Sequence, residues 1–332
     1  MEEISKLNAN VAGNVGISVV IPNYNGEYLL QQNLPFTFAA LKSSGLPYEV
    51  IVADDASSDD STLYLNKNYP DVIVIENKIN KGFSVNINSG IAKAKFNLVL
   101  LLNSDIKLDK DYFLSQIKYF ENDDTFGVMG KVLDEQTGKI LEACKYPQDT
   151  VFKINAFTNL DLKSDTAYSY YLSGANALVN RRKILALGGF NELFSPFYHE
   201  DIDLSLRAWE SGWKCYYDSL AVCRHAVSTT IKAHSSKRKI NTIGTRNKFL
   251  LHYLHHTGMR LYLWQIVTLL SMLIRWASGK IYYYPAYMMY LKMLPDAHNY
   301  KLQFISAAKE NKQYIPFINV KEQVKKAIDN IK

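Results

Sequence analysis

The stretch Leu98-Val99-Leu100-Leu101-Leu102-Asn103-Ser104-Asp105 joins five consecutive apolar residues directly to an amide, a hydroxyl and a carboxylate. An apolar run this short, bounded by polar residues, predicts a strand that is buried on both faces. In an open α/β sheet, ligands bind beyond the carboxyl ends of the strands. The polar residues 103–105 are therefore candidates for a binding site.

Two earlier segments have the same layout. Residues 17–21 (ISVVI) lead into Pro22-Asn23-Tyr24-Asn25-Gly26, and residues 49–53 (EVIVA) lead into Asp54-Asp55-Ala56-Ser57. A further strand is expected over 72–76, and amphipathic segments predict helices over 27–43, 59–67 and 83–95. This alternation predicts an α/β fold with a mainly parallel central sheet flanked by helices, and it brings the polar strand ends to one rim.

Beyond Asp105 the alternation is less regular. We expect helices over 110–120, 181–187 and 201–211, and strands over 127–133 and 168–180. Gly188, Gly189 and Gly212 are placed to end the last two helices. The expected organisation is an N-terminal tail (1–15), two halves of one domain (16–105 and 106–230) and a C-terminal helical extension (231–332).

The net charge of +6 is unevenly distributed over the 332 residues. Residues 1–231 contain 21 Lys and Arg against 28 Asp and Glu, whereas residues 232–332 contain 17 against 4, a net charge of +13. Because no nucleic-acid-binding motif accompanies this basic region, we expect an anionic membrane or a phosphorylated ligand as its partner, and no nucleic acid. Three scattered cysteines and the absence of a secretory signal at the first residues predict a cytoplasmic location with free thiols.

The most apolar part of the extension is residues 261–277. It is shorter than the roughly 20 apolar residues needed to span a bilayer. Two interpretations stay open: an interfacial helix with Trp264 and Trp276 near the lipid headgroups, or a helix packed on the rest of the protein. The cluster Tyr282-Tyr283-Tyr284-Pro285 favours peripheral membrane contact within residues 232–290.

Other polar residues of the extension are expected at the surface. Basic side chains that could cover phosphates or meet anionic lipid include Lys237, Arg238, Lys239, Arg246 and Lys248. The histidines His252, His255 and His256 are expected on the surface of a helix.

A series of motifs carries a resemblance to a known family. In chain order they are ISVVIPNYN (17–25), IVADDASSDDST (51–62), NKGFSVNINSGIAKA (80–94), LLLNSD (100–105), GGFNE (188–192) and HEDIDLSLRAW (199–209). Together they resemble the successive motifs of family 2 glycosyltransferases, and most closely the bacterial rhamnosyltransferase-like group that builds surface polysaccharides. The resemblance covers about residues 16–230. It implies a GT-A fold and inverting transfer of a sugar from a nucleotide diphosphate to an acceptor hydroxyl.

Asp105 is the candidate ligand for a divalent metal. When a diphosphate leaves, negative charge grows on the leaving oxygen, and a cation can neutralise it. A carboxylate beside the phosphates suits Mg²⁺ or Mn²⁺. The family motif has acidic residues at both ends, whereas here the first position is Asn103. Either metal affinity is weak, or Asn103, with Ser104, contacts the donor; alternatively, residues 103–105 form only a turn and helix cap. The resemblance makes His225 a second candidate metal ligand, with a purely structural histidine as the alternative.

The resemblance also implies how the nucleotide is held. Asp54 would accept the imide N–H of uracil or thymine, a donor that cytosine lacks, so the implied donor is a UDP- or dTDP-sugar. Further donor contacts are assigned to Pro22, Tyr24, Asn25, Gly82 and Asn88. Asp55 and Asp59 are expected to be capping or surface residues at the start of the second helix.

Asp201 is the candidate catalytic base. Inverting transfer needs one group that takes the proton of the acceptor hydroxyl. The resemblance assigns this role to the aspartate of the Glu200-Asp201 pair, while Glu200 would orient the acceptor or raise the pKa of its neighbour. Alternatively, both carboxylates serve only as favourable charges at a helix N-terminus. Asp203 and Arg207, four residues apart, are expected to form an ion pair within the helix.

These assignments require Asp54, Asp105 and Asp201 to converge on one cavity. We then expect an enzyme that extends a glycan or a lipid-linked oligosaccharide, at the inner face of the cytoplasmic membrane. Two other classes stay open: a non-catalytic module that binds sugar nucleotides or glycans, which would account for Asn103, and a nucleotidyltransferase. Residues 22–26 lack the glycine-rich basic loop of the latter, and no G-x-G-x-x-G follows the first strand to suggest a dehydrogenase.

Overall fold

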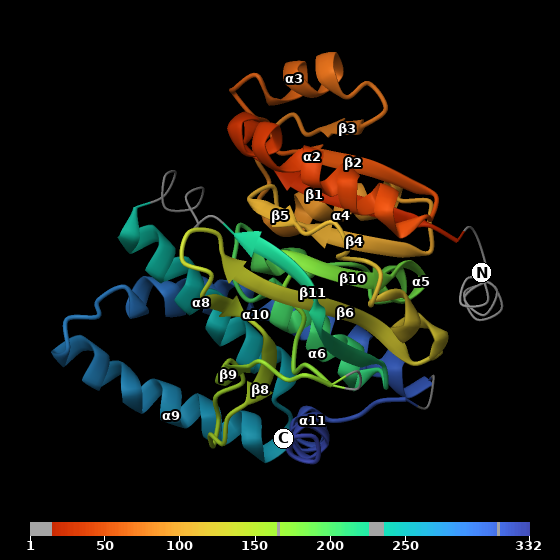
Figure 1. The fold of residues 1–332 in the computed structure, drawn as a ribbon. Helices are drawn as coiled ribbons and strands as arrows, with labels where there is room; N and C mark the ends of the chain where they lie inside the picture. The colour runs from red at the N-terminus through yellow and green to blue at the C-terminus, as the bar shows by residue number, and fades with distance from the viewer. Residues whose placement is uncertain (1–14, 165–166, 226–235, 311–312) are drawn as a thin grey trace.

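The computed structural model describes residues 15–164, 167–225, 236–310 and 313–332, so the expected N-terminal tail lies almost entirely outside the described residues. The strands are β1 (Ile17–Asn23), β2 (Tyr48–Asp54), β3 (Ile73–Glu76), β4 (Leu98–Leu102), β5 (Ile106–Leu108), β6 (Thr125–Asp134), β7 (Ile140–Glu142), β8 (Cys144–Pro147), β9 (Phe157–Leu160), β10 (Asn176–Asn180) and β11 (Lys214–His225). The helices are α2 (Glu27–Ser44), α3 (Ser61–Asn68), α4 (Phe83–Lys93), α5 (Arg181–Ala186), α6 (Glu200–Glu210), α8 (Lys237–His255), α9 (Gly258–Ala277), α10 (Tyr283–Glu310) and α11 (Phe317–Asp329), with short 3-10 helices η1 (Ile117–Glu121) and η2 (Glu192–Phe194). The central sheet has the order β3-β2-β1-β4-β10-β6-β11-β5, with β7 beside β6, and β8 pairs with β9 in a small separate sheet (Figure 1).

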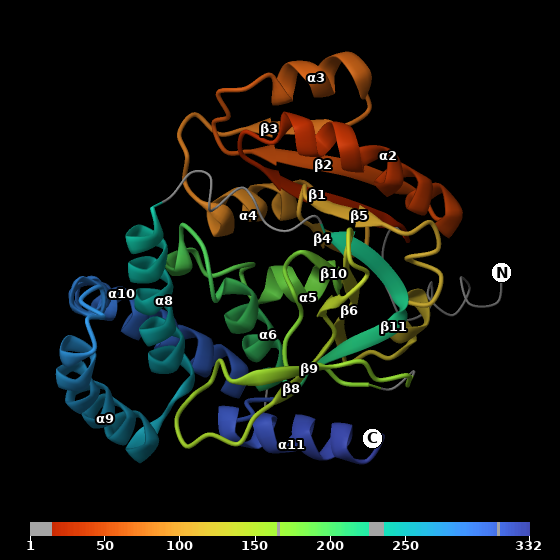
Figure 2. The same ribbon diagram turned by 60° about the vertical axis from the view of Figure 1, so that its left-hand side comes forward.

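The first four strands of this order pair in parallel, and β1 lies between β2 and β4. Val20 of β1 is in register with Ile51 of β2 and with Leu101 of β4. Alternate side chains enter two cores: Val19 belongs to the core under α2 and α3, whereas Val20 belongs to the core under α4 and α6 (Figure 2). Burial on both faces explains why these strands read as unbroken apolar runs.

The second half of the sheet is mixed. β10 runs antiparallel to both β4 and β6, β6 runs parallel to β11, and β5 closes the edge antiparallel to β11. The expected α/β class, with a largely parallel sheet flanked by helices and a C-terminal helical region, is confirmed. Antiparallel pairs enter where the alternation of strands and helices in the sequence ends, and one sheet continues through residues 16–105 and 106–230.

Two elements differ from the sequence-based expectation. In place of a helix over 110–120 there is a series of turns followed by η1, because Tyr112 and Phe113 are both fully buried and the Tyr112 hydroxyl donates a hydrogen bond to the carbonyl of Asn176. The strand expected over 168–180 shortens to β10. Residues 169–172 instead bond to three separate elements, β11, β8 and α6, so they do not form one ladder.

The C-terminal helices belong to the main body of the protein. α8 and α10 lie side by side, and α11 packs beneath β8 (Figure 2). Leu250 and Leu251 of α8 and Val324 of α11 are part of the same buried core as the sheet. Among the described residues, no helix combines the length and the apolar character needed to cross a membrane.

The three histidines at the end of α8 are buried, contrary to expectation. His252, His255 and His256 are 2%, 3% and 0% exposed. The N–H of Ile154 donates to Nε2 of His252 (3.2 Å), and Nε2 of His256 lies 2.8 Å from the carbonyl oxygen of Phe152. This end of α8 is enclosed by the loop before β9, by α6 and by α10, so its polar residues serve internal contacts.

Gly90 of α4 packs directly against β1. We expect the stability of the protein to depend on the absence of a side chain at this position. A Cβ atom at Gly90 would lie 2.4 Å from Cγ1 of Val20. We expect Gly90→Ala to lower the free energy of unfolding by about 1–3 kcal/mol through overpacking, although alanine is intrinsically the better helix former by about 1 kcal/mol. Gly244→Ala in α8 is the matched control, because its Cβ would meet Tyr198 at 3.4 Å, an ordinary contact. Thermal denaturation that finds the two variants equally stable would contradict this account.

Candidate active site

A cleft of about 590 Å³ opens at the carboxyl ends of β1, β2 and β4. Residues from both halves of the domain line it. The sequence-predicted site residues in its lining are Pro22, Tyr24, Gly82, Asn103, Ser104, Asp105, Glu200, Asp201 and His225. The structure therefore brings together most of the candidates for donor, metal and catalysis.

Asp54 is directed into the protein and not into the cleft. It is 3% exposed, and its carboxylate accepts hydrogen bonds from the Asn23 side chain (2.8 Å) and from the backbone and hydroxyl of Ser57 (2.8 and 2.6 Å). The expected convergence of three aspartates fails for this residue, and the neighbouring Asp55 lines the cleft instead. Successive side chains along a strand point in opposite directions. An error of one position therefore exchanges the residue that faces the cleft with the one that faces the interior.

Asp55 fixes the loop that forms one wall of the cleft. Its two carboxylate oxygens accept the backbone N–H groups of Lys81 (2.9 Å) and Gly82 (2.8 Å) and the side-chain amide of Asn77 (3.1 Å). Gly82 has φ +86°, and a Cβ there would lie 2.6 Å from Cα of Pro196. Glycine is needed here because the loop approaches the Pro196 segment closely, in a conformation that side chains disfavour.

Asn25 and Asn88 support the backbone outside the lining of the cleft. Asn25 adopts φ +50° and accepts the N–H of Ser58 (2.7 Å). The side-chain amide of Asn88 makes two hydrogen bonds with the backbone of Phe190. It donates to the carbonyl (2.9 Å) and accepts the N–H (2.8 Å). Neither side chain is part of the cleft lining, so their expected donor contacts stay predictions.

Asp105 and His225, the two candidate metal ligands, lie side by side in the cleft lining. The antiparallel pairing of β11 with β5 places His225 opposite Ile106, next to Asp105 in the chain. Nε2 of His225 lies 3.0 Å from Oδ2 of Asp105, and this hydrogen bond raises the pKa of His225.

The pair has the donor chemistry of a divalent metal site. Oδ1 of Asp105 is buried and has no hydrogen-bond partner among the described residues, and an unpaired buried oxygen is costly unless a ligand satisfies it. The described part of the chain holds no cluster of three or more potential protein ligands. A carboxylate with one imidazole fits Mg²⁺ or Mn²⁺ when substrate phosphates complete the coordination.

Glu200 and Asp201 lie at the N-terminus of α6, on the other side of the cleft. The two residues that directly precede α6 are Tyr198 and His199. Their φ values of 80° and 73° turn the chain sharply into the helix. Burial, with the charge of Glu142, raises the pKa of Asp201 to about 6. Burial and the neighbouring Asp201 raise the pKa of Glu200 to about 8. Both carboxyl groups therefore hold a proton more readily than ordinary carboxyl groups do.

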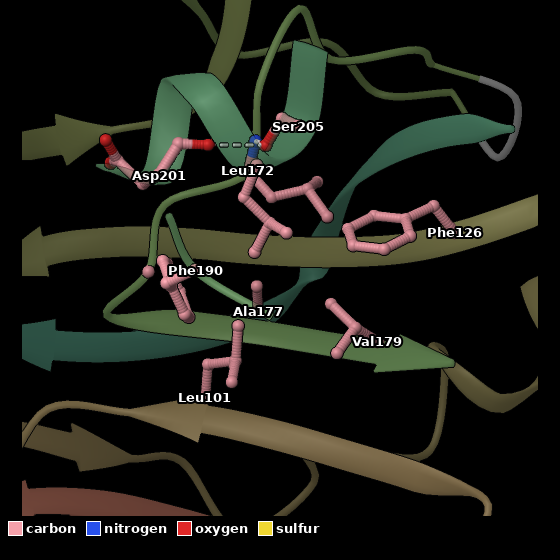
Figure 3. Close-up of a pocket in the computed structure, with 10 residues that line it drawn as sticks. Leu101, Phe126, Leu172, Ala177, Val179, Phe190, Asp201 and Ser205 are labelled. Carbon is pink, nitrogen blue, oxygen red and sulfur yellow. Dashed lines mark hydrogen bonds between the residues drawn. The ribbon is translucent and has the colours of Figure 1, made fainter. Parts of the chain in front are cut away.

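The low polarity beneath Asp201 has a visible cause. Apolar side chains, including Leu172, Ala177 and Phe190, line a small pocket between the first turn of α6 and the sheet, and the Asp201 carboxylate points away from them (Figure 3). The Ser205 hydroxyl donates to the backbone carbonyl of Asp201 (2.9 Å) and accepts the N–H of Leu172 (2.9 Å). Asp201 is therefore held next to apolar side chains, and this surrounding disfavours the charged form of its carboxylate.

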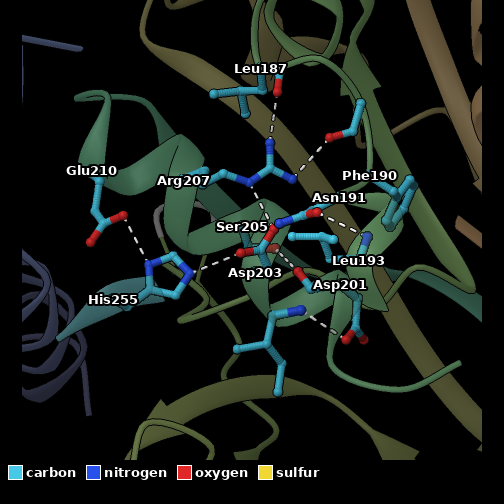
Figure 4. A network of polar contacts seen from close by, with 12 residues as sticks. Leu187, Phe190, Asn191, Leu193, Asp201, Asp203, Ser205, Arg207, Glu210 and His255 are labelled. Atoms are coloured by element: carbon cyan, nitrogen blue, oxygen red, sulfur yellow. Dashed lines mark hydrogen bonds and ion pairs between the residues drawn. The ribbon is translucent and has the colours of Figure 1, made fainter. Parts of the chain in front are cut away.

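A buried polar network holds α6 in place (Figure 4). The expected ion pair is confirmed: Nε of Arg207 donates to Oδ2 of Asp203 at 2.8 Å, and the same guanidinium donates to the carbonyls of Leu187 (2.8 Å) and Gly189 (2.9 Å). His255 of α8 lies between Asp203 (3.1 Å) and Glu210 (2.9 Å). Since all these charged side chains are at most 3% exposed, α6 and α8 form one unit.

Asn247 of α8 clamps the loop that enters α6. It is 0% exposed, and its Nδ2 lies within hydrogen-bond distance of the carbonyls of Phe194 (2.5 Å), Phe197 (2.8 Å) and Tyr198 (3.0 Å). Arg246 is also buried and donates to the carbonyl of Ser195 (2.5 Å). The expectation that Arg246 faces phosphate or lipid is wrong, because its guanidinium serves this loop.

Sequence reasoning missed several residues of the cleft and its supports. Glu142, at the end of β7, lines the cleft, and its charge contributes to the raised pKa values of Asp201 and His225. It lies in a stretch without a clear sequence pattern, so no signal could have singled it out. Lys239, in the first turn of α8, is the member of the expected basic group that reaches the cleft lining. Asn247 carried no signal, because its function depends on tertiary contacts.

Comparisons with known proteins agree with this architecture. A family model described as glycosyl transferase family 2 matches residues 18–184. The poly-beta-1,6-N-acetyl-D-glucosamine synthase of Staphylococcus aureus is 23% identical over 241 residues, which are 68% of this chain and 53% of the relative. The chain thus spans about half the length of this relative.

Solved structures share the fold. The mannosyltransferase PcManGT from Pyrobaculum calidifontis, in complex with GDP-Man and Mn²⁺, aligns with a TM-score of 0.51 at 14% identity, over 99% of this chain and 92% of that one. GalNAc-T7 with UDP, GalNAc and Mn²⁺ aligns with a TM-score of 0.57 at 16% identity, over 73% of this chain and 48% of that one.

The buried network predicts a characteristic pH dependence of stability. Burial lowers the pKa of His255, but Glu210 and Asp203 outweigh this effect and raise it to about 9. Folding therefore favours the protonated ring, so its contribution is complete below the ordinary histidine pKa of about 6.5 and disappears as the pH rises through 9. We expect the difference in free energy of unfolding between wild type and His255→Gln to shrink by about 3 kcal/mol between pH 6 and pH 10. Urea denaturation across this range that finds a constant difference would contradict the assignment.

Proposed function

Because the chain belongs to glycosyl transferase family 2, we propose that it is an inverting glycosyltransferase, which moves a sugar from a nucleotide diphosphate to an acceptor hydroxyl. One observation carries this proposal. A single cleft is lined by the pair Asp105 and His225 and by the half-buried Asp201. Its volume of about 590 Å³ lies in the range of small-molecule sites.

Asp201 is the proposed general base. Its carboxylate takes the proton of the acceptor hydroxyl while that oxygen forms a bond to the anomeric carbon. The bond between the anomeric carbon and the diphosphate oxygen breaks on the opposite face, and the nucleotide diphosphate leaves with the electron pair. The pKa of Asp201, raised to about 6, makes it a stronger base than an ordinary aspartate while leaving it ionised at neutral pH. Glu200, whose pKa is raised by burial and by Asp201, orients the acceptor beside the base.

Asp105 and His225 are the proposed protein ligands of Mg²⁺ or Mn²⁺, with Asn103 and Ser104 beside them in the lining. When bound, the ion neutralises the negative charge of the departing diphosphate. The presence of Mn²⁺ in the structures of GalNAc-T7 and PcManGT supports this part of the proposal. Lys239 of α8 adds a positive charge to the same cleft.

We propose UDP- or dTDP-sugars as donors. Pro22 and Tyr24 at the end of β1 and Asp55 after β2 line the cleft together. A carboxylate at this position can accept the imide N–H of uracil or thymine, which cytosine lacks. Asp55 is as little exposed as Asp54 (3%), and its carboxylate already accepts N–H groups of Lys81 and Gly82. It replaces Asp54 in the proposal only because it lines the cleft. The UDP in the GalNAc-T7 structure is consistent with such a donor.

The proposed acceptor is a glycan or a lipid-linked oligosaccharide, in the synthesis of a bacterial surface polysaccharide of the O-antigen or capsule kind. The similarity to a Staphylococcus aureus polysaccharide synthase supports a polymeric product. The +13 charge of residues 232–332 supports a site of action at the inner face of the cytoplasmic membrane. A non-catalytic sugar-nucleotide-binding module is the second candidate, favoured by Asn103 alone, and it would bind the donor without turnover.

The base assignment predicts the effect of Asp201→Asn. We expect this variant to lower kcat about 10²- to 10⁴-fold, with little change in donor affinity, because the amide cannot accept the hydroxyl proton. In the wild type, kcat/KM should fall tenfold per pH unit below about pH 6, where Asp201 becomes protonated. Product formation from a radiolabelled donor measures both effects. Asp71→Asn, at an exposed position away from the cleft, is the control and should keep full activity. An Asp201→Asn variant as active as this control would remove Asp201 from the mechanism.

The metal assignment predicts a linked thermal shift. With Mn²⁺ and UDP or dTDP together, we expect the wild-type Tm to rise by several degrees, because ligands that bind only the folded state stabilise it. Removal of Mn²⁺ by EDTA should abolish most of this shift, and so should Asp105→Asn. CDP serves as the comparison nucleotide and should stabilise less. An equal shift with and without Mn²⁺, or an unchanged shift in Asp105→Asn, would contradict the metal site.

A further inference from the structure

Helix α9 presents an apolar face to solvent. Met259, Leu263, Ile266, Leu270 and Ile274, called here the α9 face, are 70%, 44%, 36%, 63% and 71% exposed. They follow one another at intervals of three or four residues and therefore lie on one side of the helix. A contiguous exposed apolar surface of this kind marks an interaction site in a soluble protein.

The opposite side of α9 attaches it to the protein. Trp264 is 6% exposed and stacks on His252 of α8 at 5.4 Å between ring centroids, and its ring also meets Tyr290 of α10 at 6.4 Å. Met272, two turns further along, is 7% exposed. In both views α9 lies at the periphery of the molecule, away from the central sheet (Figures 1 and 2). The helix is thus held along one side while its α9 face stays open.

The charge of the surrounding chain indicates what covers the α9 face. Residues 258–295, which are α9 and the chain that follows it, contain four Lys and Arg and no Asp or Glu. Arg260 and Arg275 of α9 are half-buried against Val151 and Tyr283, whereas Lys280 and Lys292, which follow α9, are exposed. A second copy of this chain would bring a like-charged surface against the face, which disfavours self-association. An anionic surface is complementary.

Two aromatic residues beside the α9 face restrict the class of partner further. Tyr262 and Trp276, beside the α9 face, are 60% and 68% exposed. Tyrosine and tryptophan concentrate at the boundary between lipid headgroups and hydrocarbon. An apolar helix face bordered by basic and aromatic residues is typical of a helix that lies in the plane of that boundary. We propose that α9 docks this protein on an anionic lipid bilayer, with the α9 face in the acyl region and the basic residues at the headgroups.

This inference deepens the proposed function, and it rests on that function only for the identity of the acceptor. α8 links the two sites: Lys239 in its first turn lines the cleft, and α9 begins shortly after its last residue, His255. A helix of 19 residues is about 28 Å long. Docking through α9 therefore fixes the cleft at a short distance from the membrane, where a lipid-linked acceptor would be presented.

Vesicle co-sedimentation of the full chain, without donor or acceptor, tests the docking. The vesicles contain phosphatidylcholine alone or with 30% phosphatidylglycerol. We expect at least tenfold tighter binding to the anionic vesicles, weakened by salt. The double variant Leu270→Gln/Ile274→Gln should bind at least tenfold more weakly. Leu63→Gln/Leu220→Gln is the matched control, because these leucines are 62% and 68% exposed elsewhere on the surface, and it should bind like the wild type.

Three outcomes would overturn the docking proposal. They are no binding of the wild type to anionic vesicles, equal binding by Leu270→Gln/Ile274→Gln, and a wild-type dimer in light scattering that this variant converts to a monomer. The last outcome would assign the α9 face to a second copy. Transfer to a water-soluble acceptor, measured on the same preparations, separates the two proposals. Lost vesicle binding with intact transfer would count against docking alone, whereas absent transfer with normal vesicle binding would count against the proposed function alone.

Discussion

The parallel pairing of β1 with β2 and β4 is the constraint on which the site depends. Each strand is buried on both faces, so the polar residues that follow it can emerge only where the strand ends. Parallel pairing places those ends side by side. The register of Val20 with Ile51 and Leu101 therefore sets Pro22, Asp55 and Asp105 around one opening without further adjustment.

The α6 side of the cleft is built differently. Asp201 does not come from a strand end but from the first turn of α6, and α6 is held by buried contacts with α8. His255 joins Asp203 to Glu210, and Asn247 holds the loop that enters α6. Removing one member of such a buried charged network leaves the others unpaired, which is strongly destabilising. The C-terminal helices are therefore part of the scaffold that holds the cleft, and α9 is the part of them with an exposed apolar face.

The limits of prediction follow from the same physics. The strands up to Asp105 could be placed because their apolar runs are continuous, and the candidates at their ends, such as Asn103 and Asp105, do line the cleft. The choice between Asp54 and Asp55 failed because it depends on a one-residue alternation at a strand end. Glu142 and Asn247 could not be foreseen, since their positions follow from long-range packing. The buried state of His255 was missed because its two carboxylate partners lie 45 and 52 residues away in the chain.

The central claim is that one cleft holds the diphosphate beside Asp105 and His225 and exposes the anomeric carbon to Asp201. A crystal structure of the protein with Mn²⁺ and a non-hydrolysable UDP-sugar tests it most directly. The account predicts the diphosphate and the metal next to Asp105 and His225, with the sugar between them and the Asp201 carboxylate. A nucleotide bound elsewhere, or a sugar separated from Asp201 by the wall of the cleft, would contradict it.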